Sequence, residues 1–166
     1  MYELYYDEVK EAIYQVDPKG KKTIIADDFP SKPVFSPSKN KALYISPLEW
    51  ECLGSVYLFN IENGYITEIV KPSDNQETPK YAIWIDEENI ALIIGFGYGT
   101  VSIGGNVFKY NLTTQVLQQL THYPPEIQVT KLELQENSLQ LIGIQYIDSN
   151  FNEFEEFKDV LQLLEV

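Results

Sequence analysis

The side chains best suited to chemistry lie in the segment DSNFNEFEEFKD, residues 148–159. Oxygen-bearing side chains stand at positions 1, 3, 5, 9 and 12 of this segment: Asp148, Asn150, Asn152, Glu156 and Asp159. EF-hand calcium loops use this spacing, because Ca²⁺ takes several oxygen ligands. Position 6 is Glu153, where such a loop needs glycine, and the flanks read as strands instead of helices. An acidic hairpin tip therefore fits better than a calcium site. A short amphipathic helix with Phe154 and Phe157 on one side is a further alternative.

A second candidate is the stretch GFGYGTVSIGGN, residues 95–106, which holds five glycines. A P-loop ends in Gly-Lys-Ser/Thr and delivers the phosphate to a helix N-terminus. A dinucleotide-binding turn likewise opens a helix. This stretch has no lysine and is expected to have a strand on each side. It is therefore interpreted as a long hairpin whose glycines permit positive φ angles, with a mobile recognition loop as the alternative.

The remaining reactive residues form no recognisable catalytic set. Cys52 is the single cysteine, which excludes an internal disulfide, and His122 is the single histidine. The acidic runs 27–28 and 86–88 are adjacent in sequence, so their side chains diverge on an extended backbone. We predict a protein that is not an enzyme and has no cofactor, with calcium as the one candidate ligand. A hydrolase with converging carboxylates is kept as an alternative.

The charge of the chain narrows the partners. The 166 residues include 25 acids and 12 basic residues, all of them lysine, for a formal net charge of −13. Nucleic acid and anionic membranes would be repelled, whereas metal ions or basic proteins are favoured. No apolar run approaches the roughly 20 residues of a membrane helix. The N-terminus MYELYYDEVKEAIYQ has no apolar signal core, so a soluble, cytoplasmic protein is expected.

The elements that would position these residues come from an internal repeat. SVYLFNIENGYITEIV (55–70) matches NVFKYNLTTQVLQQLT (106–121), with a shorter copy at 11–26 and a last fragment at 159–166. The segments SKNKALYIS, EENIALIIG and QENSLQLIG align upstream of them. Each unit thus reads as four strands, a to d. A period of roughly 40–50 residues with four strands is typical of a propeller blade.

We therefore predict an all-β fold of antiparallel four-stranded repeats that form a small or incomplete β-propeller. One domain, residues 1–166, would hold about four blades with partial end blades: 1–32 (partial), 33–79, 80–126 and 127–166 (partial). Phe35 and Trp84 occupy equivalent positions in strand a and are expected in the core. The first unit lacks strand a and the last lacks strand d. Either the two ends close on each other or a second copy pairs with the exposed edge; a closed monomer is favoured over a homodimer.

The repeats resemble those of TolB-like and WD-type β-propellers. The likeness lies in PVFSPSKNKALYI and NVFKYNLTTQVLQQLT, and it covers most of residues 33–121. Residues 38–40 replace the Asp-Gly turn of that class. Small bacterial proteins of unknown function carry short arrays of such repeats, and this chain resembles them. The resemblance implies a binding scaffold, since in propellers attached to peptidases the chemistry belongs to another domain.

Antiparallel strands place the short a–b and c–d turns at one end of each blade and the long connections at the other. The long segments are 7–11, 27–33, 46–54, 71–80, 95–106, 122–127 and 147–159. They hold 15 of the 25 acids and five of the 12 lysines. Functional residues tend to lie on long loops of rigid scaffolds. The predicted interaction face comprises Glu49, Trp50, Glu51, Gly97, Tyr98, Gly99, Glu153 and Glu155.

The predicted function is a non-catalytic binding or scaffold module that recognises an unknown protein with a basic surface. Trp50, between Glu49 and Glu51, is expected as an exposed contact residue. An aromatic ring beside carboxylates could also stack on a sugar, so a calcium- or glycan-binding module is the alternative.

Overall fold

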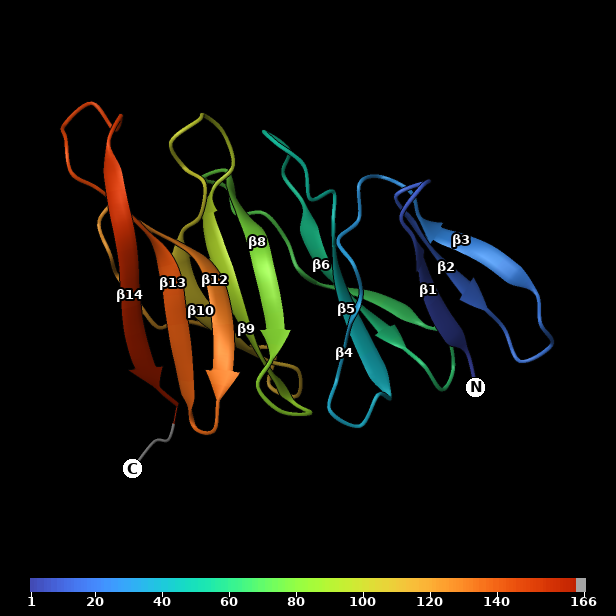
Figure 1. Cartoon of the computed structure of the whole chain (residues 1–166). Coiled ribbons are helices and arrows are strands. Elements are labelled where there is room, and N and C mark those ends of the chain that lie inside the picture. The colour runs from blue at the N-terminus through green and yellow to red at the C-terminus, as the bar shows by residue number, and fades with distance from the viewer. Residues whose placement is uncertain (164–166) are drawn as a thin grey trace.

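The computed structural model describes residues 1–163, which form fourteen strands and no helix (Figure 1). The strands are β1 (Glu3–Asp7), β2 (Ala12–Val16), β3 (Lys22–Ala26), β4 (Val34–Phe35), β5 (Lys41–Ser46), β6 (Ser55–Asn60), β7 (Ile66–Val70), β8 (Glu77–Trp84), β9 (Asn89–Phe96), β10 (Asn106–Asn111), β11 (Leu117–Gln119), β12 (Ile127–Gln135), β13 (Ser138–Tyr146) and β14 (Phe154–Gln162).

The strands form four antiparallel sheets that follow one another along the chain. The orders are β1-β2-β3, β4-β5-β6-β7, β8-β9-β10-β11 and β12-β13-β14. Every strand pairs only with its neighbours in sequence, and the four sheets stand in a row (Figure 1). The predicted fold class, an incomplete β-propeller with three-stranded end blades, is confirmed.

Side-chain caps fix the tight turns at one end of the blades. Asp17 Oδ1 accepts the backbone N–H of Lys19 at 2.9 Å, and Asn60 Oδ1 accepts that of Glu62 at 2.9 Å. Asp86 and Asn111 cap the corresponding turns of the third blade in the same way. Aspartate and asparagine favour turns because their oxygens satisfy backbone donors two residues ahead. These repeated caps set the strand pairs that carry the longer loops at the opposite end.

The core lies between the sheets, in three apolar clusters. Phe59 and Ile13 belong to the cluster between the first and second sheets, and Leu43 packs with Trp84 between the second and third. Ile93 packs with residues of β12 and β13 between the third and fourth. Strands in the middle of the row are covered on both faces, so their sequences read as unbroken apolar runs instead of alternating patterns. Each blade is thereby fixed by its neighbours.

The structure corrects the expected burial of Phe35. Trp84 is buried, with 6% of its surface exposed, but Phe35 is 40% exposed. The two positions are equivalent, because Phe35 pairs with Ala42 as Trp84 pairs with Ile90. Trp84 packs against the second sheet, where its Nε1–H donates to the carbonyl of Val34 at 2.7 Å. Phe35 faces the first sheet, which lacks strand a, so no equivalent strand covers it.

Two strands begin earlier than the repeat predicts. β8 starts at Glu77 and β14 at Phe154, so the long connections shrink to 71–76 and 147–153. The helical alternative for Phe154 and Phe157 is wrong, because both lie in β14. The acidic residues of 154–159 belong to a strand and not to a hairpin tip. The last three residues of the predicted strand 159–166 lie outside the described part.

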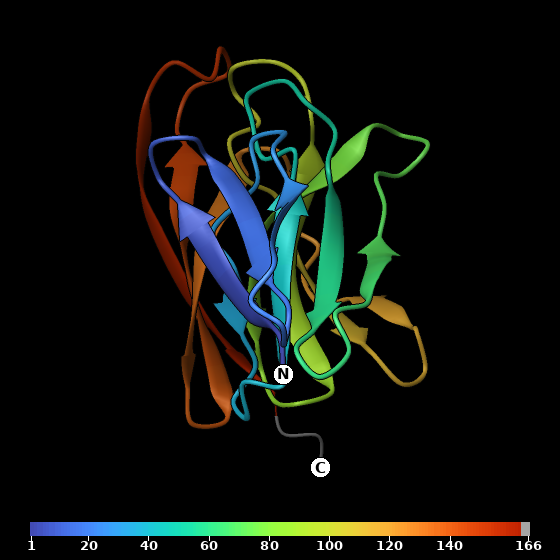
Figure 2. The ribbon, with the colours of Figure 1, turned by 90° about the vertical axis from the view of Figure 1, so that its right-hand side faces the viewer.

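The ring does not close through its end sheets. The first and last sheets share no strand pairing in residues 1–163, and they stand at opposite ends of the row (Figure 1). Figure 2, viewed from the right-hand side of Figure 1, places the first sheet in front of the others. The expectation of a closed monomer is wrong in this respect. β1 and β14 each have one edge without a partner strand within the described residues.

Candidate functional site

Two of the long loops converge on one groove. The loop between β5 and β6 supplies residues 47–52, and the loop between β9 and β10 supplies Gly97, Gly99 and residues 102–103. Residues 78–80 of β8 lie beneath them. The groove encloses about 330 Å³, which lies at the small end of the range of protein ligand pockets. It lies between the second and third blades, at the end of the molecule that carries the long loops.

Backbone hydrogen bonds hold the two loops in place. The N–H of Gly54 donates to Thr78 Oγ1 at 2.8 Å, which ties the first loop to the next blade. The N–H of Gly97 donates to the carbonyl of Gln76 at 2.9 Å. The N–H of Gly99 donates to Glu51 Oε1 at 3.3 Å, which joins the two loops directly. The groove walls are therefore fixed to the sheets and to each other.

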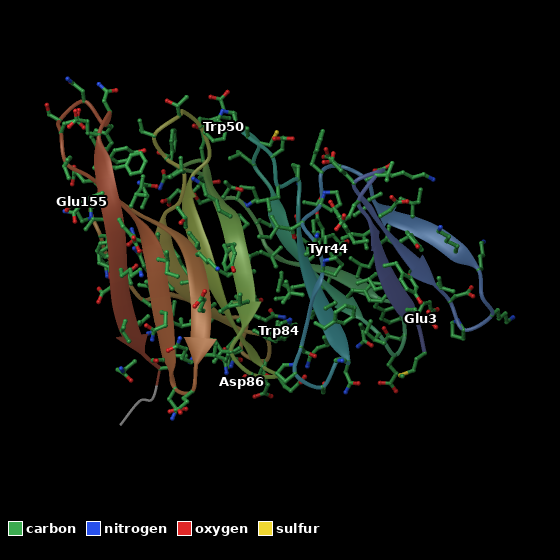
Figure 3. All side chains as sticks on the ribbon, in the orientation of Figure 1. Glu3, Tyr44, Trp50, Trp84, Asp86 and Glu155 are labelled. Carbon is green, nitrogen blue, oxygen red and sulfur yellow. The ribbon has the colours of Figure 1, made fainter. Side chains whose placement is uncertain are left out.

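Trp50 is the most prominent apolar side chain at the groove. It is 56% exposed, and it lies at the upper end of the molecule in Figure 3. Glu49 Oε1 accepts the backbone N–H of Trp50 at 2.8 Å, which fixes that carboxylate at the backbone of Trp50. Leu48 and Ile103 add exposed apolar surface next to it. The groove thus combines an aromatic contact surface with the carboxylates of Glu49 and Glu51.

Lys80 lines the base of the groove, and sequence reasoning missed it. Its ammonium donates to the carbonyl of Gly104 at 2.9 Å and to that of Ser102. Burial lowers the pKa of Lys80 to about 8, because desolvation disfavours the charged form. The sequence indicated Lys80 only as a lysine within the otherwise uncharged run TPKYAIW. A charged side chain inside a buried strand needs hydrogen-bond partners.

The glycines of 95–106 have a structural cause. A Cβ on Gly95 would lie 2.0 Å from the carbonyl oxygen of Gly104, and one on Gly104 would lie 2.0 Å from that of Val129. Gly105 and Val129 exchange hydrogen bonds of 3.0 and 3.1 Å in an isolated bridge to the fourth blade. Gly99 differs, because it has open space around it and a φ of +87°. Strands flank the loop on both sides, and no helix receives it within residues 1–163.

The predicted calcium residues do not come together. Asp148 Oδ1 accepts the N–H groups of Glu153 at 3.0 Å and Asn152 at 2.9 Å, and these bonds lower the pKa of Asp148. Glu156 lies on β14 and pairs with Lys158 at 3.0 Å. Asp159 lies further along that strand. Within residues 1–163, no group of three or more His, Cys, Asp or Glu side chains is placed to hold a metal ion.

Asp159 instead accepts a hydrogen bond from the hydroxyl of Tyr123. That bond lowers the pKa of Asp159, and burial followed by the same bond raises that of Tyr123. The ring of Tyr123 also contacts Phe157 edge-on, with centroids 5.1 Å apart. These contacts attach β14 to the link between the third and fourth blades.

The predicted interaction face divides into two groups. Five of its residues line the groove together: Glu49, Trp50, Glu51, Gly97 and Gly99. Tyr98 packs edge-on against Phe96 beside them, with centroids 5.9 Å apart. Glu153 belongs to the β13–β14 loop, and Glu155 belongs to β14. Glu155 lies away from Trp50 in Figure 3. Neither lines the groove.

The acidic run 86–88 makes contacts that support the fold. Asp86 caps its turn, Glu87 pairs with Lys41 of the second blade at 3.5 Å, and Glu88 accepts the hydroxyl of Thr113 at 3.1 Å. Each of the three carboxylates thus has a different set of partners. Asp86 marks this turn in Figure 3, at the lower end of the molecule and remote from the groove.

A comparison of the sequence with family models gives one match. Residues 48–162 match a family described as a domain of unknown function, DUF4652. The chain belongs to this family. The match begins at the first groove loop and covers both loops that form the groove. A search of the curated proteins found no significant match.

Solved structures share the fold. A Clostridium novyi NT protein described as a conserved lipoprotein is 24% identical, with a TM-score of 0.74 over 81% of this chain and 88% of that one. TolB from Acinetobacter baumannii is 12% identical, with a TM-score of 0.51 over 96% of this chain and 40% of that one. The β-propeller domain of the Trilobed protease from Pyrococcus furiosus, described as having an open velcro topology, is 10% identical. Its TM-score is 0.56, over 98% of this chain and 52% of that one. The chain thus spans about half or less of the two larger propellers.

The likeness to TolB and other propellers agrees with the resemblance inferred from the repeats. No helix within residues 1–163 is long and apolar enough to cross a membrane.

Proposed function

We propose that the protein is a non-catalytic binding module that takes a basic segment of a partner protein into the groove between the β5–β6 and β9–β10 loops. The observation that carries the proposal is Trp50, an exposed aromatic side chain in a groove that Glu49 and Glu51 also line. Tryptophan is enriched among the residues that dominate protein interfaces.

The electrostatics favour a cationic partner. Glu49 and Glu51 contribute two carboxylates to the groove, and the whole chain carries a formal net charge of −13. The ammonium of Lys80 is engaged by two backbone carbonyls, which leaves the carboxylates as the charged groups at the mouth. A lysine or arginine of the partner would lie over the indole and against these carboxylates, since such cations are attracted to the face of tryptophan.

The groove volume supports a small contact. About 330 Å³ accommodates one or two side chains and not a folded surface. An extended peptide segment with a basic residue therefore fits better than a broad, flat interface.

A second candidate, a glycan ligand, is favoured by the same indole. Sugar rings stack on tryptophan while their hydroxyls donate to nearby carboxylates. The two candidates differ in their response to salt, because exposed charge pairs are screened within about 10 Å at 0.1 M ionic strength and stacking is not.

The experiment is a selection from a displayed random-peptide library, with a glycan array run in parallel. Enrichment of peptides with basic residues is expected on the wild type, and it should be lost on Trp50→Ala and on the double variant Glu49→Gln, Glu51→Gln. The matched control is Tyr65→Ala, because Tyr65 is 72% exposed but lies in the tight turn at the opposite end.

Three outcomes distinguish the candidates. Trp50-dependent peptides whose binding weakens with salt support the proposal. Trp50-dependent binding of glycans, indifferent to salt, replaces it with the glycan module. Peptide binding that survives Trp50→Ala contradicts both.

An unfolding scan with Ca²⁺ and with chelator tests the calcium prediction separately, and a stabilisation abolished by Asp148→Asn would restore it.

The cytoplasmic location expected from the sequence stays a prediction. Cell fractionation with an antibody against the chain would test it.

A further inference from the structure

β14 is an unusually long outer edge. It has nine residues, whereas the outermost strands β3, β7 and β11 have five, five and three. In the second and third sheets a fourth strand covers the third one, but within the described residues nothing pairs with the outer side of β14. Figure 1 shows β14 at the left-hand edge of the molecule. Such an edge presents a row of backbone donors and acceptors to a further strand.

The two faces of β14 differ in character. Phe157 and Leu161 pack into the apolar cluster shared with the third sheet. Phe154 and Val160 lie on the opposite face and are 58% and 49% exposed. Glu156 shares that face with Lys158, its partner in a 3.0 Å ion pair. Along the strand, this exposed face therefore presents an apolar, an acidic, a basic and an apolar side chain in that order.

This order is complementary to itself. When two copies of β14 run antiparallel with the two Phe157 residues opposite each other, Glu156 lies opposite the partner's Lys158. In the same register Phe154 lies opposite the partner's Val160. Opposite charges and apolar pairs directly across a sheet are stabilising. The register thus pairs each of these four exposed residues with a suitable partner, and the twofold axis repeats each pair.

Neighbouring registers are poorer. A centre on Glu156 or on Lys158 places that residue against its own copy, and like charges directly opposite are destabilising. A slip by a single residue would pair the exposed face of one copy with the buried face of the other. The favoured register has one unfavourable pair, in which Glu155 lies opposite the partner's Asp159.

We propose that two copies of this chain associate through β14, antiparallel about Phe157, and merge their last sheets into one sheet of six strands. The partner strand takes the position that a fourth strand has in the middle blades. Symmetric pairing of the same surface on both subunits is the commonest route to a homodimer. The proposal is independent of the groove, which lies between the second and third blades.

The experiment measures molar mass by light scattering on a sizing column across a dilution series. The wild type is expected at twice the chain mass of 19.1 kDa, with dissociation on dilution. Lys158→Glu should raise the dissociation constant about tenfold or more, because the like-charge contact occurs twice across the axis. The charge swap Glu156→Lys with Lys158→Glu should restore the dimer. Glu155→Lys should tighten it, because it converts the one unfavourable pair.

Control measurements separate the interface from the fold. Lys131→Glu changes the same charge on the far strand of the same sheet, where Lys131 pairs with Glu133 at 3.2 Å, and should leave the dimer unchanged. Circular dichroism should show all variants folded, since the substituted side chains are exposed. Coupling with a carbodiimide in a mixture of ¹⁴N and ¹⁵N chains should join Lys158 to Glu156 of the partner subunit.

Any of three results would overturn the proposal. These are a mass of 19.1 kDa at every soluble concentration, a dimer indifferent to Lys158→Glu, or a charge swap that fails to restore association.

Discussion

The β5–β6 and β9–β10 loops occupy the same place in two adjacent blades but have opposite sequences. The first has one glycine and presents Trp50, whereas the second is glycine-rich and presents mainly backbone. Both nevertheless end on a glycine that has no room for a side chain. A Cβ on Gly54 would lie 2.2 Å from the carbonyl oxygen of Pro47, and one on Gly105 would lie 2.1 Å from that of Ile94.

The shared glycine belongs to a repeated joint between blades. Gly54 donates its N–H to Thr78 Oγ1 of the following blade, and Gly105 donates its own to the backbone carbonyl of Val129 of the next at 3.0 Å. Both acceptors lie near the start of the first strand of their blade. The two loops therefore differ at their tips. The joint supports the fold, whereas the sequence of the tip can vary to serve binding.

The largest effect is expected for Gly105→Ala. The new Cβ would lie 2.1 Å from a backbone oxygen of β9, so the strand pair or the bridge to Val129 must give way. We expect a loss at or above the upper end of the roughly 1–3 kcal/mol typical of overpacking. Gly99→Ala is the control, because it meets no atoms and costs only the roughly 1–2 kcal/mol of a left-handed residue. Urea unfolding measures both, and equal losses would contradict a joint at Gly105.

Next in size is Thr78→Val, which removes the acceptor for Gly54 in the first joint. The N–H of Gly54 is buried and would lose its 2.8 Å partner, at a cost of about 1–3 kcal/mol. Thr78→Ser keeps the hydroxyl and should retain most of the stability. If the serine variant were as unstable as the valine variant, packing and not the hydrogen bond would explain the loss.

Lys80 gives the second loop a pH dependence that the first lacks. The pKa of Lys80 is about 8 in the folded chain and 10.5 when unperturbed, because burial disfavours its charge. Between these values the unfolded chain binds more protons, so the free energy of unfolding should rise from pH 8 to pH 10.5. Solvent reaches part of this side chain, so the rise is smaller than the shift alone implies. The comparison is with Lys80→Met. If the free energy of unfolding changed with pH in the same way in both proteins, the effect would be excluded.

The smallest effect on stability is expected at the tip of the first loop. Trp50 is largely exposed, so Trp50→Ala should change the free energy of unfolding by less than about 0.5 kcal/mol while it removes peptide binding. The measurement is the unfolding midpoint beside the binding assay. A large destabilisation would place Trp50 among the supports of the loop instead of its contacts.

The fold could be predicted from the sequence because the repeat consists of short, regular segments. Turn residues such as Asp17, Asn60 and Asn111 recur at matching positions and delimit the strands.

Phe35 was wrongly expected in the core because equivalent positions of a repeat are not always covered alike: Trp84 packs against the second sheet, whereas the first sheet has no strand a to cover Phe35. The start of β14 was missed because Phe154 and Phe157 are three residues apart, a spacing that fits one side of a helix as well as the two faces of a strand.

The candidate site was only partly accessible from sequence. Trp50 and its flanking glutamates stood out as an aromatic between acids in a loop, and the groove joins them to Gly97 and Gly99. Lys80 stood out only as a lysine in an otherwise uncharged run, and its partners could not be predicted because those carbonyls lie more than twenty residues away. The calcium spacing failed to predict an arrangement in space, because a strand separates side chains that a calcium loop would gather.

The stacking of sheets in a row implies a gradient of cooperativity along the molecule. Within residues 1–163 the apolar clusters join each sheet to its neighbours in the row, as in linear repeat proteins whose stability is a sum over units and interfaces. Amide protons of β5 and β9, covered on both sides, should exchange with solvent only on global unfolding, and those of β1–β3 should exchange through local opening. Self-association through β14 would slow exchange at the far end alone, so the two ends of the chain would differ in their kinetics of opening.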